Sequence, residues 1–256
     1  MRPACALLLF LPPLAAASPL LRSEGIATND AGTVVYREVH WQRGQADGSE
    51  RWVQYLCPDG RPFARKRLPA AAVPQRRGYV LEDQRSGQRA QIVVDSGAVQ
   101  VAWTEHLGAA ERDARVPLPA GAVIDAGFDA AVRQQWPALM RGEAVSLPFL
   151  IPGRQRFYPM KVQHRGSVRW QGLPAQSIEV RLDAWYGAAA PRLQLVYADA
   201  DRRLLEFRGI SNLRDARDDY PPVTIRFAEA AVDVPQSQWQ AHWQRPLVSR
   251  CAAAAR

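Results

Sequence analysis

The sequence predicts a mainly β fold of the α+β class, in which an antiparallel sheet is accompanied by one central helix and a short C-terminal helix. Short runs rich in Val, Ile, Tyr, Trp and Thr recur along the chain and are separated by turn residues, a pattern typical of antiparallel strands. Two other segments space their apolar side chains three and four residues apart, as helices do. The 256 residues suffice to bury a complete core.

The first half of the chain is predicted to form a meander of strands. Apolar and polar residues alternate in several of its runs, which cover residues 33–42, 51–57, 62–67, 79–84, 89–95 and 98–105. Glycine-containing turn sequences separate neighbouring runs at residues 58–61, 85–88 and 95–97. Connections this short join antiparallel neighbours, because parallel strands need long crossovers.

The central helix is predicted over residues 130–142. Asp125 or Asp129 is expected to cap its first backbone N–H groups, and Gly142 is a natural C-terminal stop. Pro137 kinks this helix or divides it into two. One face is apolar and packs against the sheet or, alternatively, closes a ligand cavity; it carries Phe128, Val132, Trp136 and Leu139.

Strand patterns resume after the helix. They cover residues 144–150, 156–164, 168–171, 177–182, 193–197, 203–208 and 223–227. Near the C-terminus, Trp239 and Trp243 share one face of a short helix that is expected to dock on the sheet. No linker divides the chain, so residues 18–256 are predicted to form a single mainly β domain, with a sub-boundary near 117–121 as the alternative.

Residues 1–17 have the features of a signal peptide. Arg2 precedes an apolar stretch, and small residues end at Ala17, where cleavage is expected. The apolar stretch is too short to span a bilayer, and no second stretch reaches that length. We therefore expect a periplasmic or secreted protein with no transmembrane segment in the mature chain.

Export changes the interpretation of the cysteines. Removal of Cys5 with the signal peptide leaves Cys57 and Cys251 as an even pair in an oxidising compartment. The pair is predicted to form a disulfide that ties the C-terminal tail to the first strands. Two unpaired thiols are the alternative.

The chain is basic, with a formal charge of +8. Of its 33 basic residues 31 are arginine, whose guanidinium binds phosphates and carboxylates in bidentate fashion. The alternative origin of the arginines is codon usage in a GC-rich genome, which the alanine runs favour. Because the charge is displayed outside the cytoplasm, nucleic acid is excluded as a partner, and an acidic ligand or envelope surface remains.

No catalytic signature is present. The sequence lacks a nucleophile elbow, a phosphate-binding glycine loop and metalloprotease or kinase motifs. The four histidines are far apart, so no metal site and no cofactor is predicted. We expect a protein that is not an enzyme.

Aromatic and arginine residues are the remaining site candidates. Most aromatic side chains are expected to fill the core, but a sheet covered by a helix also builds cavities for apolar ligands. The candidate lining residues are Trp103, Trp136, Phe149 and Phe157. Candidate arginines for an acidic headgroup at the cavity mouth are Arg154, Arg156 and Arg208. The function expected is binding or carrying an apolar amphiphile, such as a lipid or acyl chain; the alternative is an envelope structural or protein-interaction module without a cavity.

Three passages carry a resemblance to known proteins. Residues 201–215 read DRRLLEFRGISNLRD and residues 220–227 read YPPVTIRF, while the earlier run 32–40 reads GTVVYREVH. These passages resemble uncharacterised exported proteobacterial β-rich proteins, which are remotely similar to the half-barrel superfamily of lipoprotein carriers. The resemblance implies that the antiparallel sheet is curved, or a half-barrel, and wraps an apolar cavity closed by helices.

Overall fold

The computed structural model describes residues 19–183, 192–215 and 217–252. The predicted signal peptide, residues 1–17, lies outside this range. Among the described residues, no helix combines the length and the apolar character needed to cross a membrane.

Fifteen strands form one continuous sheet, and every pairing between them is antiparallel. The first eight are β1 (Leu20–Thr28), β2 (Val34–Arg43), β3 (Arg51–Leu56), β4 (Pro62–Leu68), β5 (Tyr79–Asp83), β6 (Arg89–Asp95), β7 (Ala98–Thr104) and β8 (Arg112–Pro117). The others are β9 (Val145–Ile151), β10 (Arg156–Trp170), β11 (Leu173–Leu182), β12 (Leu193–Ala198), β13 (Leu204–Ile210), β14 (Pro222–Arg226) and β15 (Val232–Val234).

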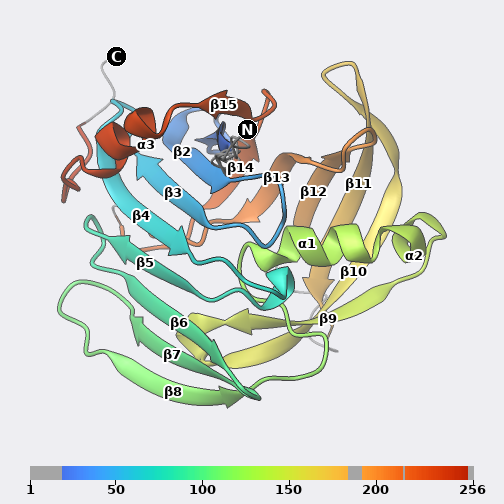
Figure 1. Ribbon diagram of the computed structural model, residues 1–256, viewed down its shortest axis with the longest axis horizontal. Helices are drawn as coiled ribbons and strands as arrows, with labels where there is room; N and C mark the ends of the chain where they lie inside the picture. Colours follow the sequence, from blue (N-terminus) through green and yellow to red (C-terminus); the bar gives the residue numbers. More distant parts are fainter. Residues whose placement is uncertain (1–18, 184–191, 216, 253–256) are drawn as a thin grey trace, which may run out of the picture.

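The strand order combines two meanders. It runs β8-β7-β6-β5-β4-β3-β2-β1-β14-β13-β12-β11-β10-β9, and β15 pairs with β1 outside this path. β1 therefore lies at the centre and joins the two halves, while β8 and β9 are the two ends of an open sheet. Figure 1 shows the sheet curved so that its halves face each other, as a half-barrel does.

The two ends of the sheet approach each other without forming a ladder. The short helical turn η2 (Pro152–Arg154) follows β9 and lies against β7. Arg112 Nη2 donates to the Gly153 carbonyl at 3.0 Å, and Gln155 Nε2 donates to the Arg112 carbonyl at 3.0 Å. A few such contacts, rather than continuous pairing, close this side of the half-barrel.

The central helical segment crosses an open end of the curved sheet (Figure 1). Pro137 divides it into α1 (Gly127–Gln134) and α2 (Trp136–Met140), one of the two predicted outcomes. Gly142 follows α2 with φ +83° and donates to the Leu139 carbonyl, as expected for a C-terminal stop. Val132 and Leu139 are fully buried in a core shared with β9 to β12.

The predicted capping of this helix by an aspartate is wrong. The residue before the first turn is Ala126, and no side chain caps the helix. The Asp125 carboxylate binds Lys66 instead, and the Asp129 carboxylate accepts a hydrogen bond from Tyr197. Both aspartates are recruited by partners from strands that are distant in sequence.

The C-terminal helix α3 (Gln236–Trp243) covers the outer face of β2 and β3. The ring of Trp239 lies 4.7 Å from the ring of Trp52, and Trp41 beneath them has no exposed surface. The buried Gln54 side chain donates to the His242 carbonyl at 2.9 Å. This packing buries the outward apolar side chains of β2 and β3.

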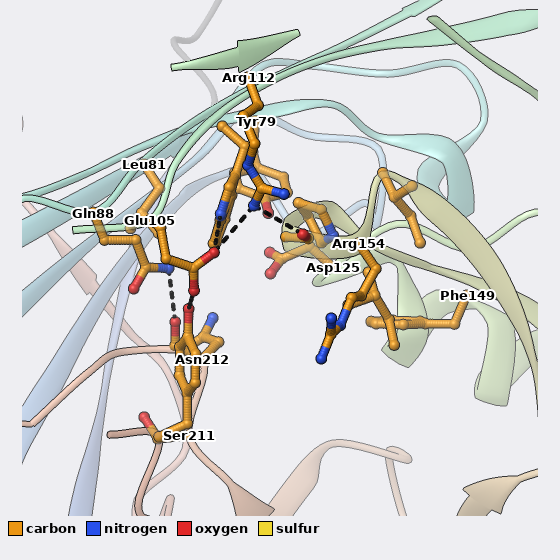
Figure 2. Close-up of a pocket in the computed structure, with 16 residues that line it drawn as sticks. Tyr79, Leu81, Gln88, Glu105, Arg112, Asp125, Phe149, Arg154, Ser211 and Asn212 are labelled. Carbon is orange, nitrogen blue, oxygen red and sulfur yellow. Dashed lines mark hydrogen bonds and ion pairs between the residues drawn. The ribbon is translucent and has the colours of Figure 1, made fainter. Parts of the chain in front are cut away.

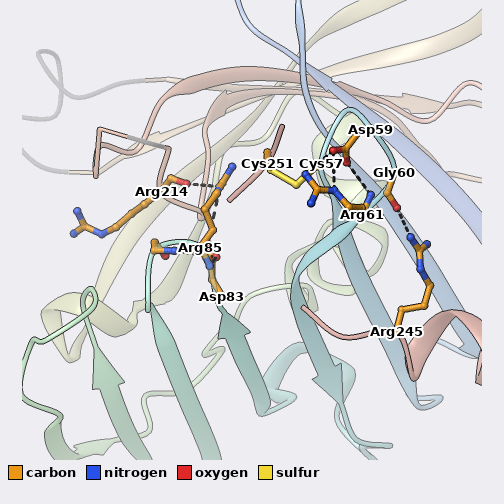
Figure 3. Close-up of a disulfide and its surroundings, with 10 residues drawn as sticks. Cys57, Asp59, Gly60, Arg61, Asp83, Arg85, Arg214, Arg245 and Cys251 are labelled. Atoms are coloured by element: carbon orange, nitrogen blue, oxygen red, sulfur yellow. Dashed lines mark hydrogen bonds and ion pairs between the residues drawn. A yellow bond between two sulfur atoms is a disulfide. The ribbon is translucent and has the colours of Figure 1, made fainter. Parts of the chain in front are cut away.

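The Cys57–Cys251 disulfide forms, as the sequence predicted, and joins residues 194 positions apart. Figure 3 shows it at the turn that follows β3, next to Arg61. Val248 N–H donates to the Pro62 carbonyl at 2.8 Å, and Arg245 Nη2 donates to the Gly60 carbonyl at 2.9 Å. These contacts hold the tail that follows α3 against the start of β4.

Three strands were not predicted from the sequence: β1, β8 and β15. β1 contains Arg, Ser, Glu and Gly, which are weak strand formers, and its position between β2 and β14 imposes the extended conformation. β10 is one strand where two were expected, with a bulge between His164 and Gly166.

Candidate functional site

A cavity of about 330 Å³ lies inside the half-barrel, beneath α1. We call it the central cavity. Its volume is within the range of roughly 300–1,000 Å³ typical of small-molecule sites. Its two walls differ in chemistry because they come from different halves of the chain.

One wall of the central cavity is apolar. It is formed by inward-facing side chains of β9 to β14 together with α1, and comprises Phe128, Phe149, Met160, Val180, Leu193, Leu195, Leu204, Phe207, Ile210, Ile225 and Phe227. Phe128 and Phe149 meet edge to face at 6.1 Å. This wall offers an apolar ligand continuous hydrocarbon surface.

The opposite wall, from β2 to β4, is rich in polar groups: Tyr36, Glu38, His40, Arg51, Tyr55 and Lys66. Tyr36 and Ser211 hydroxyls lie 3.3 Å apart, and His40 Nε2 lies 3.0 Å from Glu38 Oε2. Burial raises the pKa of Tyr36 and of Tyr55 well above the ordinary value, so both remain neutral donors.

A buried ion pair spans the polar wall and the segment before α1. Lys66 Nζ lies 2.8 and 3.0 Å from the two Asp125 carboxylate oxygens, and Asp125 has the positive φ of 44° that Asp and Asn tolerate. Burial lowers the pKa of Lys66, but the Asp125 carboxylate outweighs burial and leaves the pKa raised. The pair fixes the start of α1 on β4.

A second cavity, of about 560 Å³, opens beside the first; we call it the Glu105 cavity (Figure 2). Glu105 accepts hydrogen bonds from Trp103 Nε1 at 2.9 Å and from Tyr220 OH at 3.2 Å, and it pairs with Arg112 and Arg214. Burial raises the pKa of Glu105, but the hydrogen bonds from Trp103 and Arg214 outweigh burial and lower it.

The Glu105 network holds a loop across the half-barrel. Residues 211–221 connect β13 to β14, and Arg214 and Tyr220 of this loop reach Glu105, which follows β7. Gln88 Nε2 donates to the Asn212 carbonyl at 3.1 Å, and Arg85 donates to the Arg214 carbonyl (Figure 3). The loop is therefore attached at two places, the turn between β5 and β6 and the segment that follows β7.

A third cavity, of about 510 Å³, lies at the other side of the central one; we call it the Asp47 cavity. Arg133 of α1 binds the Asp47 carboxylate at 2.6 and 3.2 Å. Arg51, from the start of β3, donates to Gln42 Oε1 from Nε at 3.2 Å and from Nη2 at 2.8 Å. Arg203 pairs with Asp201 at 3.3 Å.

The three cavities share lining residues. The central and Glu105 cavities both contact Asp125, Phe149, Ser211 and Asn212. The central and Asp47 cavities both contact His40, Arg51, Asp129, Leu204 and Phe227. The half-barrel thus contains a central cavity flanked on one side by the Glu105 cavity, whose lining is mainly apolar, and on the other side by the more polar Asp47 cavity.

The structure brings three of the seven candidate ligand-binding residues together. Trp103, Phe149 and Arg154 line the Glu105 cavity, and Phe149 also lines the central cavity. Arg154 is exposed, and Figure 2 shows it beside Phe149. No ion pair to Arg154 occurs among the described residues.

The other four candidates lie away from these cavities. Trp136 is buried against Tyr197, and Phe157 packs at the margin of the core formed by the first half of the sheet. The exposed guanidinium of Arg156 lies over the ring of Tyr158 at 5.3 Å. Arg208 is exposed and pairs with Glu206 on the same strand.

Sequence reasoning missed the polar wall. The alternation in β2 places Tyr36, Glu38 and His40 on one face, and this signal was present in the sequence. The pattern indicates two faces but not which of them is inside. Because α3 covers the opposite face, the polar side chains point inward.

No group of three or more His, Cys, Asp or Glu side chains within the described parts of the chain is arranged to hold a metal ion. The absence of a metal or cofactor stays a prediction.

Comparisons with known proteins identify the fold and nothing finer. No family model matches the sequence, and no curated protein matches it. A solved beta-barrel-like protein of the domain of unknown function DUF1849 from Brucella abortus is similar in structure, with a TM-score of 0.50 and 8% identity, over 85% of this chain and 97% of that one. A solved domain named for outer membrane lipoprotein sorting, from Vibrio parahaemolyticus, has a TM-score of 0.29 and 9% identity, over 90% and 92%.

The similarity to the Brucella protein confirms the predicted half-barrel fold. At this level of identity the likeness extends to the fold alone. That fold, with its open antiparallel sheet and interior cavity, is compatible with binding an apolar ligand.

Proposed function

We propose that the protein binds an apolar amphiphile, such as a lipid or an acyl chain, in the central cavity and carries it without changing it chemically. The observation that supports this proposal best is the continuous apolar wall, which comes from six strands and α1. An apolar ligand that covers the apolar surface lining a cavity removes this surface from water. The binding free energy becomes more favourable by about 25 cal/mol per Å² of apolar surface covered.

Arginines at both sides of the cavity fit an acidic headgroup. Arg154 lies at the Glu105 cavity and Arg51 lies between the central and Asp47 cavities. Trp103 and Phe149 then form the apolar surface near Arg154. The proposal requires no metal, cofactor or nucleic acid.

The proposed compartment is the periplasm, reached with a signal peptide that is cleaved near Ala17. The disulfide supports an oxidising compartment, since such bonds are rare where thiols are kept reduced. N-terminal sequencing of the protein from a periplasmic extract tests the cleavage, and a mature chain that begins before residue 10 contradicts it.

Bound lipid is the direct test of the carrier proposal. We expect organic extraction of the natively purified protein, followed by mass spectrometry, to yield an amphiphile in near-stoichiometric amount. The variant Leu204→Trp places a larger side chain in the cavity. The amount of amphiphile recovered with this variant is expected to be at least tenfold lower than with the wild type. The matched control Val93→Trp adds the same side chain at an exposed strand position and is expected to retain the ligand. A folded wild-type protein that neither carries nor binds an amphiphile contradicts the proposal.

The alternative is an envelope interaction module that uses a sheet edge. Among the described residues, no other strand pairs with one edge of the terminal strand β8, and most of its side chains are exposed. Its charged residues Arg112, Asp113 and Arg115 are typical of an edge protected against pairing, which weakens this alternative. Crosslinking in cells from a position on β8 tests it, and one dominant protein adduct combined with a lipid-free interior favours it.

A further inference from the structure

We infer that the Asp47 cavity contains the binding subsite for an anionic headgroup, a carboxylate or a phosphate, with Arg51 as its principal ligand. The inference rests on the proposed function, because the apolar tail of the same molecule occupies the central cavity. It assigns the ligand to the class of singly headed anionic amphiphiles.

Arg51 is placed where a headgroup and a tail must meet. Its side chain lines both the Asp47 and the central cavities, and Leu204 and Phe227 line the same junction. A molecule whose anion contacts Arg51 can pass between Leu204 and Phe227 and extend its chain along the apolar wall. The order of the side chains therefore matches the order of groups in an amphiphile.

The Arg51 guanidinium is only partly satisfied by the protein. Its Nε and Nη2 donate to Gln42 Oε1, which is neutral. Among the described residues, no carboxylate lies within ion-pair distance of it, and Nη1 has no acceptor. A half-buried cation in this state gains more from an anion than an exposed one does, because water screens it less.

Four carboxylates and three guanidinium groups line the Asp47 cavity. Asp47 and Asp201 pair with Arg133 and Arg203, and Glu229 is exposed. Arg77 is 3% exposed, and its side chain donates to the Asp47 backbone carbonyl rather than to a carboxylate. The Asp47 carboxylate is bound by Arg133, and the Asp129 carboxylate accepts from Tyr197 OH at 2.8 Å. Among the described residues, Arg51 is therefore the guanidinium of this cavity that has no carboxylate within ion-pair distance.

The pKa values of Arg77 and Arg51 are shifted in the same direction. Burial, followed by the charge of Arg51, lowers the pKa of Arg77 to about 10. Burial also lowers the pKa of Arg51, and the nearby Asp129 does not fully compensate. An added anion relieves both effects.

The competing position for the headgroup is Arg154. That side chain is exposed, so water screens an ion pair there and weakens it. Arg51 is more buried than Arg154, so we expect an anion to bind Arg51 more tightly than Arg154 after it has lost its hydration water.

Matched ten-carbon probes test the assignment. Decanoate, decyl phosphate and decanol share one tail and differ in the headgroup, and their affinities are measured by calorimetry. We expect at least one of the two anions to bind wild-type protein tenfold or more tightly than decanol. Arg51→Gln abolishes this preference and leaves decanol binding within twofold, whereas the exposed control Arg169→Gln preserves the preference.

The outcomes separate the two proposals. Equal binding of all three probes, or a preference lost in Arg154→Gln but kept in Arg51→Gln, overturns the Arg51 assignment and leaves the carrier function intact. Failure of every probe to bind the wild-type protein overturns both. The difference between decanoate and decyl phosphate identifies the source of the anion.

A labelling experiment on the unaltered protein makes the test independent of variant folding. A fatty acid with a diazirine next to its carboxylate is bound, irradiated and mapped by mass spectrometry. Labels within residues 42–51 or 201–204 support the assignment. Labels confined to residues 103–112 or 152–154 overturn it.

Discussion

Removal of the Lys66 charge is expected to destabilise the fold strongly. The Lys66 and Asp125 side chains are 5% and 15% exposed, and their charged atoms lie 2.8 Å apart. Lys66→Met retains most of the side-chain volume but leaves the Asp125 carboxylate without its cation inside the half-barrel. Loss of one partner from a buried pair costs about 3–5 kcal/mol, mainly because the remaining charge is uncompensated.

Urea denaturation followed by tryptophan fluorescence measures this loss. The adjacent residue Arg67 supplies a matched control, because it forms a 2.9 Å ion pair with Glu50 but its side chain is 62% exposed. Arg67→Met is expected to cost about 0–1 kcal/mol. The double variant Lys66→Met/Asp125→Asn removes both charges and is expected to recover most of the stability, while Asn still tolerates the positive φ.

The pH dependence of the same pair has a defined sign. The raised pKa of Lys66 means that its stabilisation is fully present below the unfolded pKa, about 10.4, and is lost as pH rises through the folded value. The difference between wild type and Lys66→Met should therefore be constant from pH 6 to 9. Equal costs for Lys66→Met and Arg67→Met, or a double variant as unstable as the sum of the singles, would refute the reasoning.

Three further predictions concern other parts of the chain. Cys251→Ser opens a loop of 194 residues and is expected to cost up to about 5 kcal/mol in chemical denaturation on the chain-entropy model, matched by reduction of the wild type. The pKa of Glu105 is lowered, so the stability that its carboxylate contributes is present above the unfolded pKa, about 4.3, and is lost as pH falls through the folded pKa. Hydrogen exchange in residues 211–221 should therefore become faster at acidic pH. The variant Glu105→Gln should make this exchange faster at pH 7. Gly127→Ala places a Cβ 2.4 Å from the Gln75 carbonyl oxygen and should lower stability by about 1–3 kcal/mol despite the better helix propensity of alanine, as measured by thermal unfolding.

Each of these three has an outcome that contradicts it. Identical denaturation midpoints for oxidised and reduced wild type contradict the role of the disulfide. Exchange in residues 211–221 that is the same in Glu105→Gln and wild type at pH 7 shows that Glu105 does not hold this loop. An unchanged melting temperature for Gly127→Ala shows that the contact with Gln75 relaxes without cost.

Local features of the sequence were sufficient for most of the elements. The turns after β3, β5 and β6 contain glycine with positive φ at residues 60, 87 and 97, and the strands on either side of each pair as predicted. Pro137 and Gly142 determine where α1 ends and where α2 stops. These signals act within a few residues, so they are legible without the rest of the chain.

β1 shows where local signals end. Its middle residues, 22–25, are weak strand formers, yet it occupies the centre of the sheet because β2 and β14 provide hydrogen-bond partners on both sides. The 27 residues between β8 and β9 likewise carry no local signal for the position of the chain that follows them. After β9 this chain forms η2, which packs against β7. Both results depend on pairings between residues that are far apart in sequence.

The arrangement of the site follows the same division. Strand alternation determines that Tyr36, Glu38 and His40 share one face of β2, and the cysteine count predicts the bond that holds the C-terminal tail. Only the tertiary structure decides that this polar face points inward, because α3 packs on the opposite face and buries Trp41 there. A period of two residues distinguishes two faces but carries no information about which of them another element covers.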